Sequence, residues 1–478
     1  MSLEPLKRGD PERMPITCPP GGVSPVTWRS GCELQRYLTS LTSLRIVFRK
    51  LVVFCAIVDY NRRIITEGDV RLRRINRPEY LDFLIRSKDR QIIKVVSGIR
   101  RCGKSTLFDI YRDWLLDNGV SRDQIVSINF EDIDFERLTD YRLLYDHIKP
   151  LLLTDRPNYI FFDEIQHVQQ YEKAVDSLFI KKNVDIYITG SNAYFMSGEL
   201  ATLLTGRYVE LKMLPLSFAE YCEGLDLYAP DKPLTKTEKY ASYLNSSSFP
   251  YTLQLKGRQK DIREYLAGIY DSILLRDIVA RFNVSNVMML ESVTRFVFNN
   301  IGNLLSTGKI AKTMTSAGRS IDQKTVEKYL RGLTDSLLIH QAKRYNIKGK
   351  EYLATLEKYY IADIGLRQYL MGAGDTDQGH ILENVVYLEL LRRGNDVYVG
   401  QLPGGEVDFV AVNADGVTYY QVAATVLDTN TLKRELKSLE KISDHHPKIL
   451  LTLDEAGSGT KHNGIRQLNA LDWLLSSP

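Results

Sequence analysis

The sequence predicts an α/β protein, in which a parallel sheet with helices on both faces is followed by a helical segment and a further α/β unit. Between residues 91 and 216, apolar strands alternate with helices, an order that is typical of a parallel sheet covered on both faces. Apolar residues then recur at helical spacing from residue 264 to about 338, and from residue 352 strands and helices are mixed again. Because domains usually contain about 100 to 200 residues, 478 residues suggest about three units.

Composition places the chain among globular proteins. Hydrophobic residues make up 44% and charged residues 26%, far from disordered or fibrous compositions. The net charge of +4 is too small to require a nucleic-acid partner. The most apolar stretch, residues 51–58, is far shorter than the roughly 20 residues of a membrane helix. The five cysteines show neither metal-ligand nor disulfide-rich spacing, so we expect a protein of the reducing cytoplasm with no membrane partner.

Residues 1–73 show little sustained periodicity and contain the turn-forming run Cys18-Pro-Pro-Gly-Gly. We interpret them as an N-terminal extension that is either disordered or not native, with translation beginning at a codon such as that of Val70. The first domain, residues 74–220, begins near Arg77-Pro78-Glu79, which predicts a helix start because proline is favoured in the first turn.

The elements of this first domain follow one another in regular order. Helices are predicted after the first strand and at residues 143–153 and 174–180. Residues 221–263, which contain prolines and a serine run, are interpreted as a linker or lid. The five predicted strands are residues 92–96, 125–130, 159–162, 184–188 and 208–213.

A glycine-rich motif lies between the first predicted strand and the helix that follows it. It fits G-x-x-x-x-G-K-[S/T] in the strand, loop and helix context that a phosphate-binding loop requires, which disfavours an accidental glycine turn. Backbone N–H groups and the helix N-terminus would hold phosphates, Lys104 would reach the β and γ phosphates, and Ser105 would ligate Mg2+. The residues expected to contact the nucleotide are Gly98, Ile99, Arg100, Arg101, Cys102, Gly103, Lys104, Ser105 and Thr106.

Two carboxylates end the third predicted strand, in Tyr159-Ile-Phe-Phe-Asp163-Glu164. Asp163 is expected to hold Mg2+ through its water shell, and Glu164 to orient and deprotonate the attacking water. Carboxylates after a strand are common on protein surfaces, so this assignment depends on the phosphate loop. The strand at residues 125–130 is expected to lie between the loop strand and the carboxylate strand, as in P-loop ATPases that carry a catalytic glutamate. The sequence lacks the Asn-Lys-x-Asp motif, which favours ATP over GTP.

Two further residues are candidates for the reaction. Asn192, after the fourth strand, is expected to sense the γ-phosphate, although Ser-Asn after a strand is also an ordinary turn. Arg207 is expected to supply positive charge to the transition state, in cis or from a neighbouring subunit, and a surface arginine is an equal alternative.

Residues 264–350 are predicted to form a winged-helix-like helical domain. Two short helices, at residues 306–314 and 325–333, flank a turn that contains Gly318, as in a helix-turn-helix. Basic residues make this segment a candidate for contact with DNA, although a solvated helical face would look alike. These residues are Lys309, Lys312, Arg319, Lys324, Lys328 and Arg331.

Residues 351–478 are predicted to form a restriction-endonuclease-like domain without activity. Glu406 and Asp408 on one strand and Gln421 on the next resemble the metal-binding hairpin of such nucleases, with Glu383 on the preceding helix as a third acidic group. Ala423 stands where these nucleases carry a lysine, so cleavage should be severely weakened. We favour the alternative that Glu406 and Asp408 are ordinary edge-strand charges.

A set of short motifs extends over roughly residues 74–472. They are Arg77-Pro-Glu-Tyr80, Gly98-Ile-Arg-Arg-Cys-Gly-Lys-Ser105, Ile128-Asn-Phe-Glu-Asp132, Leu214-Pro-Leu-Ser-Phe218, Ile273-Leu-Leu-Arg-Asp-Ile278 and Val407-Asp-Phe-Val410. Taken together, they resemble the prokaryotic AAA-family ATPases that carry a C-terminal domain of unknown function. The resemblance implies an AAA-type P-loop core, a winged-helix segment and a nuclease-like terminal domain. Ser247-Ser248-Phe249-Pro250 stands where such proteins often have Gly-Gly-Phe-Pro.

We therefore expect an ATPase that uses Mg2+ and moves its two downstream domains during ATP hydrolysis, on DNA or on a protein partner. One alternative is a nucleotide-gated binding or regulatory module whose turnover is too slow to matter. Another is an active metal-dependent DNA nuclease. The oligomeric state stays open, and a homo-oligomer is compatible with the role suggested for Arg207.

Overall fold

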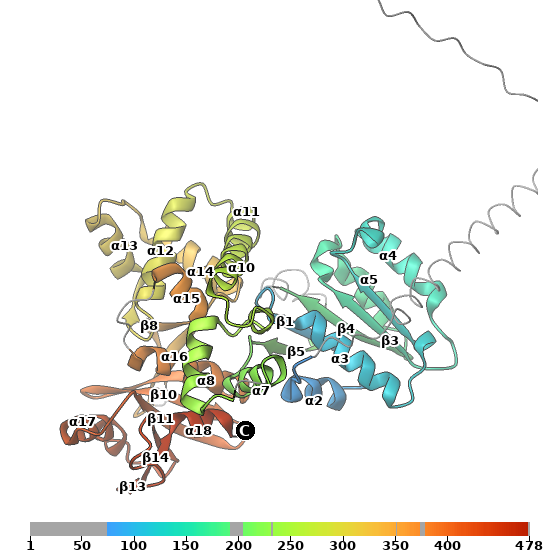
Figure 1. Ribbon diagram of the computed structural model, residues 1–478. Coiled ribbons are helices and arrows are strands. Elements are labelled where there is room, and N and C mark those ends of the chain that lie inside the picture. The colour runs from blue at the N-terminus through green and yellow to red at the C-terminus, as the bar shows by residue number, and fades with distance from the viewer. Residues whose placement is uncertain (1–73, 192–203, 231–232, 350, 373–377, 477–478) are drawn as a thin grey trace, which may run out of the picture. The chain divides into compact units, whose positions relative to one another are not determined.

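The structure is a computed structural model that describes residues 74–476, apart from residues 192–203, 231–232, 350 and 373–377. The predicted N-terminal extension and Asn192 lie outside the described residues. Two sheets, each with its own helices, account for most of the described chain (Figure 1). No helix in these described ranges is both long enough and apolar enough to cross a membrane.

The first sheet is parallel throughout and has five strands in the order β2-β3-β4-β1-β5. The predicted α/β class and all five predicted strands are confirmed. The strands are β1 Ile93–Gly98, β2 Ile125–Asn129, β3 Asn158–Asp163, β4 Val184–Gly190 and β5 Tyr208–Met213.

The predicted order of these strands was wrong at one position. The strand expected between β1 and β3 was β2, but β2 pairs only with β3 and lies at the edge of the sheet. Instead, β4 lies between them, with Tyr187 opposite Phe161 of β3 and Ile188 opposite Val95 of β1. Chain order could not reveal this, because the strand that follows β3 crosses back toward β1. The carboxyl end of β4 is therefore placed between the phosphate loop and the two carboxylates.

Helices cover both faces of this sheet (Figure 1). On one face, Phe161 of β3 packs against Phe108, with ring centroids 5.2 Å apart. On the other face, Phe162 belongs to the same buried cluster as Leu144 and Val175. Burial on both faces explains why these strands are continuous apolar runs. The helices and 3-10 turns are α2 Pro78–Arg86, α3 Lys104–Asp117, η1 Arg122–Gln124, η2 Ile133–Leu138, α4 Tyr141–Ile148, η3 Lys149–Leu151, η4 Ile165–His167 and α5 Tyr171–Phe179.

The segment interpreted as a linker or lid is largely helical and packed. Phe249 is fully buried, and Ser248 donates two hydrogen bonds of 2.6 Å to Asp363, from its N–H and its hydroxyl. Ser247 adopts φ 81°, a conformation that favours glycine, at the position where the resembling proteins often have one. Helices in and beside the segment are α7 Phe218–Tyr228, α8 Lys236–Ser246, α9 Tyr251–Gln254 and α10 Gln259–Ser272.

Beyond α10 the chain continues without interruption into a π-helix, η6 Ile273–Val279. The two short helices predicted around Gly318 are confirmed as α13 and α14, and Gly318 itself adopts φ 78°. Ser306 and Asp322 cap them by accepting backbone N–H groups of the first turn, at 3.1 and 2.9 Å. The elements are α11 Ala280–Phe282, α12 Val287–Asn299, β6 Leu304–Leu305, α13 Thr307–Ser316, α14 Gln323–Asp335, β7 Ile339–Asn346 and β8 Glu351–Ile361.

The second sheet is mixed and has nine strands in the order β13-β14-β12-β11-β10-β9-β7-β8-β6. The domain boundary predicted at residue 350 falls between β7 and β8, which pair along their length. The sheet is therefore continuous across that position. Its remaining elements are α15 Ile364–Met371, α16 Gln378–Arg392, β9 Asp396–Leu402, β10 Gly405–Asn413, β11 Gly416–Ala423, α17 Thr429–Glu440, β12 Lys448–Thr452, β13 Lys461–His462, β14 Ile465–Asn469 and α18 Ala470–Leu475.

Candidate functional site

The predicted phosphate loop connects the end of β1 to the start of α3. A Cβ atom on Gly98 would lie 2.4 Å from the carbonyl oxygen of Met213 on β5, so only glycine fits there. Gly103, which caps α3, adopts φ 107°, where a side chain would be strained. The glycines thus let the backbone turn tightly before the helix, whose free N–H groups attract anions.

Lys104 lies beside the loop with 4% of its surface exposed. Its ammonium group donates to the Gly98 carbonyl at 3.1 Å and lies 3.5 Å from a carboxylate oxygen of Glu164. An ammonium has three donors, so one is left for a ligand. The adjoining cavity of about 460 Å³ lies within the usual range of ligand pockets. It is lined by Arg100, Arg101, Gly103, Lys104, Ser105, Thr106, Glu131, Glu164, Pro250, Tyr251, Gln254 and Tyr265.

The two carboxylates at the end of β3 are buried and held by β4. The Thr189 hydroxyl donates to Asp163 and accepts the backbone N–H of Glu164 at 2.8 Å. Burial raises the pKa of Asp163, while hydrogen bonds from Ser105 and Thr189 act to lower it by a smaller amount. Burial alone would also raise the pKa of Glu164. The positive charge of Lys104 and a hydrogen bond from Gln166 outweigh burial and lower this pKa below its ordinary value. Glu164 is therefore an ionised base at neutral pH.

The donor set at this position suits a magnesium ion. Asp163 and Ser105 are hydrogen-bonded to each other, so a carboxylate and a hydroxyl lie side by side at the helix start. Mg2+ prefers oxygen ligands and usually takes one or two from the protein while keeping several waters. In the described residues there is no group of three or more His, Cys, Asp or Glu side chains arranged to hold a metal by themselves. A site shared with phosphate oxygens fits both observations.

The structure brings together the loop, Lys104, Ser105, Asp163 and Glu164, as the sequence predicted. Ile99 and Cys102 of the loop are buried in the apolar core, so only their backbone is available to a phosphate.

Arg207 does not lie near the loop. Its carbonyl accepts a hydrogen bond from Ile93, the first residue of β1, whereas the loop follows Gly98 at the other end of that strand, roughly 16 Å away at ~3.3 Å per residue. The guanidinium group pairs with Asp176 and lies over the Phe179 ring. The prediction that Arg207 acts in cis is therefore wrong, and a role in a neighbouring subunit stays a prediction.

Sequence reasoning missed Thr189 and Arg77. Thr189 lies just after the fourth predicted strand. The sequence pattern that could have indicated its role is a hydroxyl residue directly after the apolar residues Tyr187 and Ile188. Arg77 is 4% exposed and supports the loop, donating to the Cys102 carbonyl at 3.1 Å and pairing with Glu220 at 2.6 Å. Nothing in the sequence distinguishes such a buried arginine from an exposed one before a helix.

Two tyrosines from outside the first domain also line the cavity. The rings of Tyr251 on α9 and Tyr265 on α10 lie 4.9 Å apart. They had no assigned role: Tyr251 lies in the segment interpreted as a linker from its composition, and Tyr265 lies in the predicted helical domain. Flat aromatic surfaces beside phosphate-binding groups suit a nucleotide base.

A second polar cluster lies in the nine-stranded sheet, where the nuclease-like hairpin was predicted. The favoured interpretation of Glu406 and Asp408 as edge-strand charges was wrong, because β10 lies between β9 and β11 inside the sheet. The acidic groups converge, and a lysine from β8 lies among them. The Lys358 ammonium lies 2.9 Å from Glu383, 3.0 Å from Glu406 and 3.8 Å from Asp408. No sequence pattern indicated that Lys358 would lie there, because it precedes the hairpin by about fifty residues.

Lys358 and Asp408 of this cluster both have raised pKa values, for different reasons. Burial lowers the pKa of the Lys358 ammonium group, but the surrounding carboxylates, above all Glu383, raise it by more. The ammonium group therefore stays charged. Burial and then the neighbouring Glu383 raise the pKa of Asp408, whereas the charge of Lys358 lowers it. The backbone N–H of Val422 donates to Asp408 at 2.9 Å. Lys358 thus acts as an internal counter-ion.

The six basic residues singled out on and around α13 and α14 are all exposed. Arg319 donates to Ser292, and Arg331 lies 3.6 Å from Asp335. Within the described part of the chain, the four lysines of this group pair with no carboxylate.

Comparison with known proteins agrees with this architecture. Residues 90–222 match the family described as an AAA domain, and residues 237–377 match a domain of unknown function (DUF8612). An uncharacterized protein of Haemophilus influenzae is 40% identical over 402 residues, which cover 84% of this chain and 98% of the relative. The chain belongs to this AAA-domain family of P-loop ATPases.

A more distant relative extends the same family. An uncharacterized protein of Methanocaldococcus jannaschii is 30% identical over 364 residues, which cover 73% of this chain and 78% of the relative. Among solved structures, the Walker-type ATPase of Pyrococcus abyssi matches 63% of this chain and 97% of its own, with 17% identity and a TM-score of 0.45. The predicted membership of the AAA family, with a terminal region of unknown function, is confirmed by the family match.

Proposed function

We propose that this protein binds ATP and hydrolyses it with Mg2+ at the cavity beside the phosphate loop. The observation that carries the proposal is the convergence of Lys104, Ser105 and Glu164 on one pocket, with Asp163 directly before Glu164 at the end of β3. Family membership supports nucleotide binding, and the ionised Glu164 supports hydrolysis. Tyr251 and Tyr265 would contact the adenine base.

The residues divide the reaction between them. Glu164 takes a proton from a water molecule as the water oxygen attacks the γ-phosphorus, and the bond from phosphorus to the β–γ bridging oxygen breaks. On ATP binding, the Lys104 ammonium shifts its pairing from Glu164 to the phosphates, which frees the carboxylate to act as a base. Thr189 holds both carboxylates in place. Mg2+, held by Ser105 and Asp163, would neutralise charge on the β and γ phosphates.

A pair of variants tests this proposal. Glu164→Gln should still bind ATP but release phosphate at least a hundredfold more slowly in single-turnover experiments, because the base is gone. Lys104→Ala should lose ATP binding. Glu136→Gln, an exposed glutamate outside the cavity, is the matched control and should behave as wild type. A wild-type protein that binds ATP but releases phosphate no faster than Glu164→Gln would favour a slow nucleotide-gated module instead.

We further propose that the segment around α13 and α14 binds DNA. Helix α12, strand β6, helices α13 and α14 and the β7–β8 hairpin follow one another in the order of a winged helix, and the lysines on it are exposed. Replacing Lys324 and Lys328 with alanine should weaken DNA binding and reduce the slope of log affinity against log salt by about 2. An unchanged slope would contradict contact with DNA phosphates.

We infer that the terminal domain does not cut DNA. Lys358 lies where a metal ion would need free carboxylates, and Ala423 leaves the usual lysine position empty. Metal-dependent cleavage by the purified protein that disappears in Asp408→Ala would overturn this inference. A homo-oligomer, which Arg207 would need in order to act on a neighbouring site, is testable by light scattering with and without ATP.

A further inference from the structure

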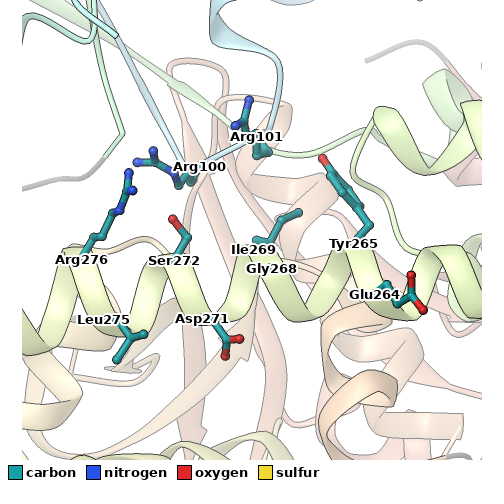
Figure 2. Close-up of a pocket in the computed structure, with 10 residues that line it drawn as sticks. All are labelled: Arg100, Arg101, Glu264, Tyr265, Gly268, Ile269, Asp271, Ser272, Leu275 and Arg276. Carbon is teal, nitrogen blue, oxygen red and sulfur yellow. The ribbon is translucent and has the colours of Figure 1, made fainter. Parts of the chain in front are cut away.

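Besides Lys104, two arginines of the phosphate loop line the nucleotide cavity, Arg100 and Arg101. They also line a second cavity, of about 620 Å³, whose other side is the continuous helix formed by α10 and η6 (Figure 2). In Figure 2 the two arginine side chains leave the loop in different directions. They therefore reach different parts of the site.

Arg100 is held close to the reacting end of the nucleotide cavity. Its side chain is 14% exposed and pairs with Glu131 at 2.9 Å. Burial raises the pKa of Glu164, and the charges of Lys104 and, more weakly, Arg100 lower it, so the guanidinium lies near enough to act on this carboxylate. Glu131 accepts one of the guanidinium N–H groups, and the others have no partner in the described part of the chain. Those N–H groups are available to a ligand.

The partner of Arg100 belongs to the motif Ile128-Asn-Phe-Glu-Asp132, which has no role in the function proposed above. The Asn129 side chain accepts the backbone N–H of Glu131 at 2.9 Å. The N–H of Phe130 donates to the Asp163 carbonyl at 3.1 Å, which ties this segment to the end of β3. The Glu131 carboxylate is therefore fixed where it orients a cation at the nucleotide site.

Hydrolysis of ATP requires a cation at this place. As the water oxygen bonds to the γ-phosphorus and the bond to the bridging oxygen breaks, the leaving ADP keeps the electron pair and Glu164 takes the water proton. Negative charge grows on the bridging oxygen during this step. An arginine beside it stabilises the transition state more than the ground state and accelerates the reaction about a thousandfold or more. Arg207 lies at the other end of β1, so it cannot do this within one chain.

We propose that Arg100 is a catalytic residue that stabilises the negative charge of the transition state from within the same chain, and that Glu131 positions it. This inference rests on the proposed hydrolysis of ATP at the cavity. The guanidinium donates N–H groups to the γ-phosphoryl oxygens and stays protonated throughout. The nucleotide site is then complete in one chain and needs no arginine from a neighbouring subunit.

Single-turnover phosphate release and calorimetric titration of the full chain test the role of Arg100. Arg100→Ala should release phosphate about a thousandfold more slowly, while its affinity for a non-hydrolysable ATP analogue falls by no more than about threefold. Its affinity for ADP with Mg2+ and aluminium fluoride, which imitates the phosphoryl group in transfer, should fall about a hundredfold or more. Retained affinity for the ATP analogue also shows that the variant is folded.

Two further variants serve as comparisons for Arg100→Ala. Arg100→Lys keeps a positive charge in the loop and should recover part of the rate, but not all of it, because an ammonium group lacks the planar fork of a guanidinium. Arg86→Ala is the matched control, because Arg86 also pairs with a carboxylate, at 2.6 Å, but is exposed and lies outside both cavities. It should behave as wild type.

A double-variant cycle tests the role of Glu131. Glu131→Ala should slow phosphate release about tenfold, because the guanidinium loses its orientation, without changing the affinity for the ATP analogue. Arg100→Ala/Glu131→Ala should be no slower than Arg100→Ala, because a residue that acts only through Arg100 has no effect once Arg100 is absent. Losses that multiply in the double variant would overturn the positioning role.

The remaining outcomes separate this inference from the function on which it rests. Unchanged phosphate release in Arg100→Ala, or an equal loss of affinity for the ATP analogue and for the fluoride complex, would overturn the catalytic role of Arg100 and leave the nucleotide site intact. Failure of the wild-type protein to bind the ATP analogue would instead overturn the proposed function.

Discussion

Replacing Lys358 with methionine should destabilise the nine-stranded sheet strongly. Methionine has a similar length but no charge, so the change leaves Glu383, Glu406 and Asp408 without their counter-ion. The side chains of Lys358, Glu383 and Asp408 are 3%, 7% and 10% exposed, so water cannot take the place of the ammonium group.

The magnitude follows from the distances. At an effective dielectric constant of about 20, a charge pair 2.9 Å apart such as Lys358 and Glu383 interacts by about 6 kcal/mol. Desolvation of both ions offsets part of this energy, and removal of one partner of a buried pair usually costs about 3 to 5 kcal/mol. We expect a loss in that range. The double variant Lys358→Met/Glu383→Gln should recover at least half, because the new amide side chain would carry no charge and Tyr360 could still donate to it.

Hydrogen exchange is the suitable assay, because unfolding of a chain with several domains is not two-state. Amides of α16 and β8 should exchange about a hundredfold faster or more in Lys358→Met, while those of the five-stranded sheet should be unchanged. A loss below about 1 kcal/mol, or a double variant less stable than the single one, would refute the view of Lys358 as an internal counter-ion.

Two further predictions concern the nucleotide site, and a third concerns a buried carboxyl group on η6. Gly98→Ala should abolish nucleotide binding in titration experiments, because its Cβ would lie 2.4 Å from the Met213 carbonyl, and retained affinity would mean that the loop adapts. Thr189→Val should slow phosphate release at least tenfold and destabilise the protein by about 1 to 3 kcal/mol, because it removes a hydrogen-bond donor from Asp163, whereas Thr189→Ser should be close to wild type in both measurements. Burial raises the pKa of Asp277 from 3.8 to about 6, so the folded state holds a proton that the unfolded state has lost, and stability should fall as the pH rises between these values. Asp277→Asn should remove this slope and add up to about 3 kcal/mol above pH 6, and denaturation curves with the same pH dependence as wild type would contradict this.

The parts of the site that depend on local sequence were predictable. The loop needs glycines at fixed positions before a helix, and the carboxylates follow directly after an apolar strand, so both could be recognised without knowing the rest of the fold. The five strands were recognisable for a similar reason, since most of them are buried on both faces and therefore continuously apolar.

What could not be predicted depends on contacts between distant parts of the chain. The position of β4 between β1 and β3 is decided by packing across the whole sheet, and it alone brings Thr189 to the carboxylates. Lys358 reaches the acidic cluster from β8, and no motif spacing describes its position. Arg207 was assigned from its position after a glycine, without the sheet register that places it at the other end of β1.

The pairing of β7 with β8 has a consequence for attempts to divide the protein. A fragment that ended at residue 350 would lose β8 and β9, the two strands that flank β7, and would present bare backbone donors and acceptors along that strand. A complementary fragment starting at residue 351 would keep Lys358 but would expose β8 and β9 in the same way. Both pieces would be prone to pair with other polypeptides through these exposed strands, so a shortened protein should keep the region from α12 to α18 whole.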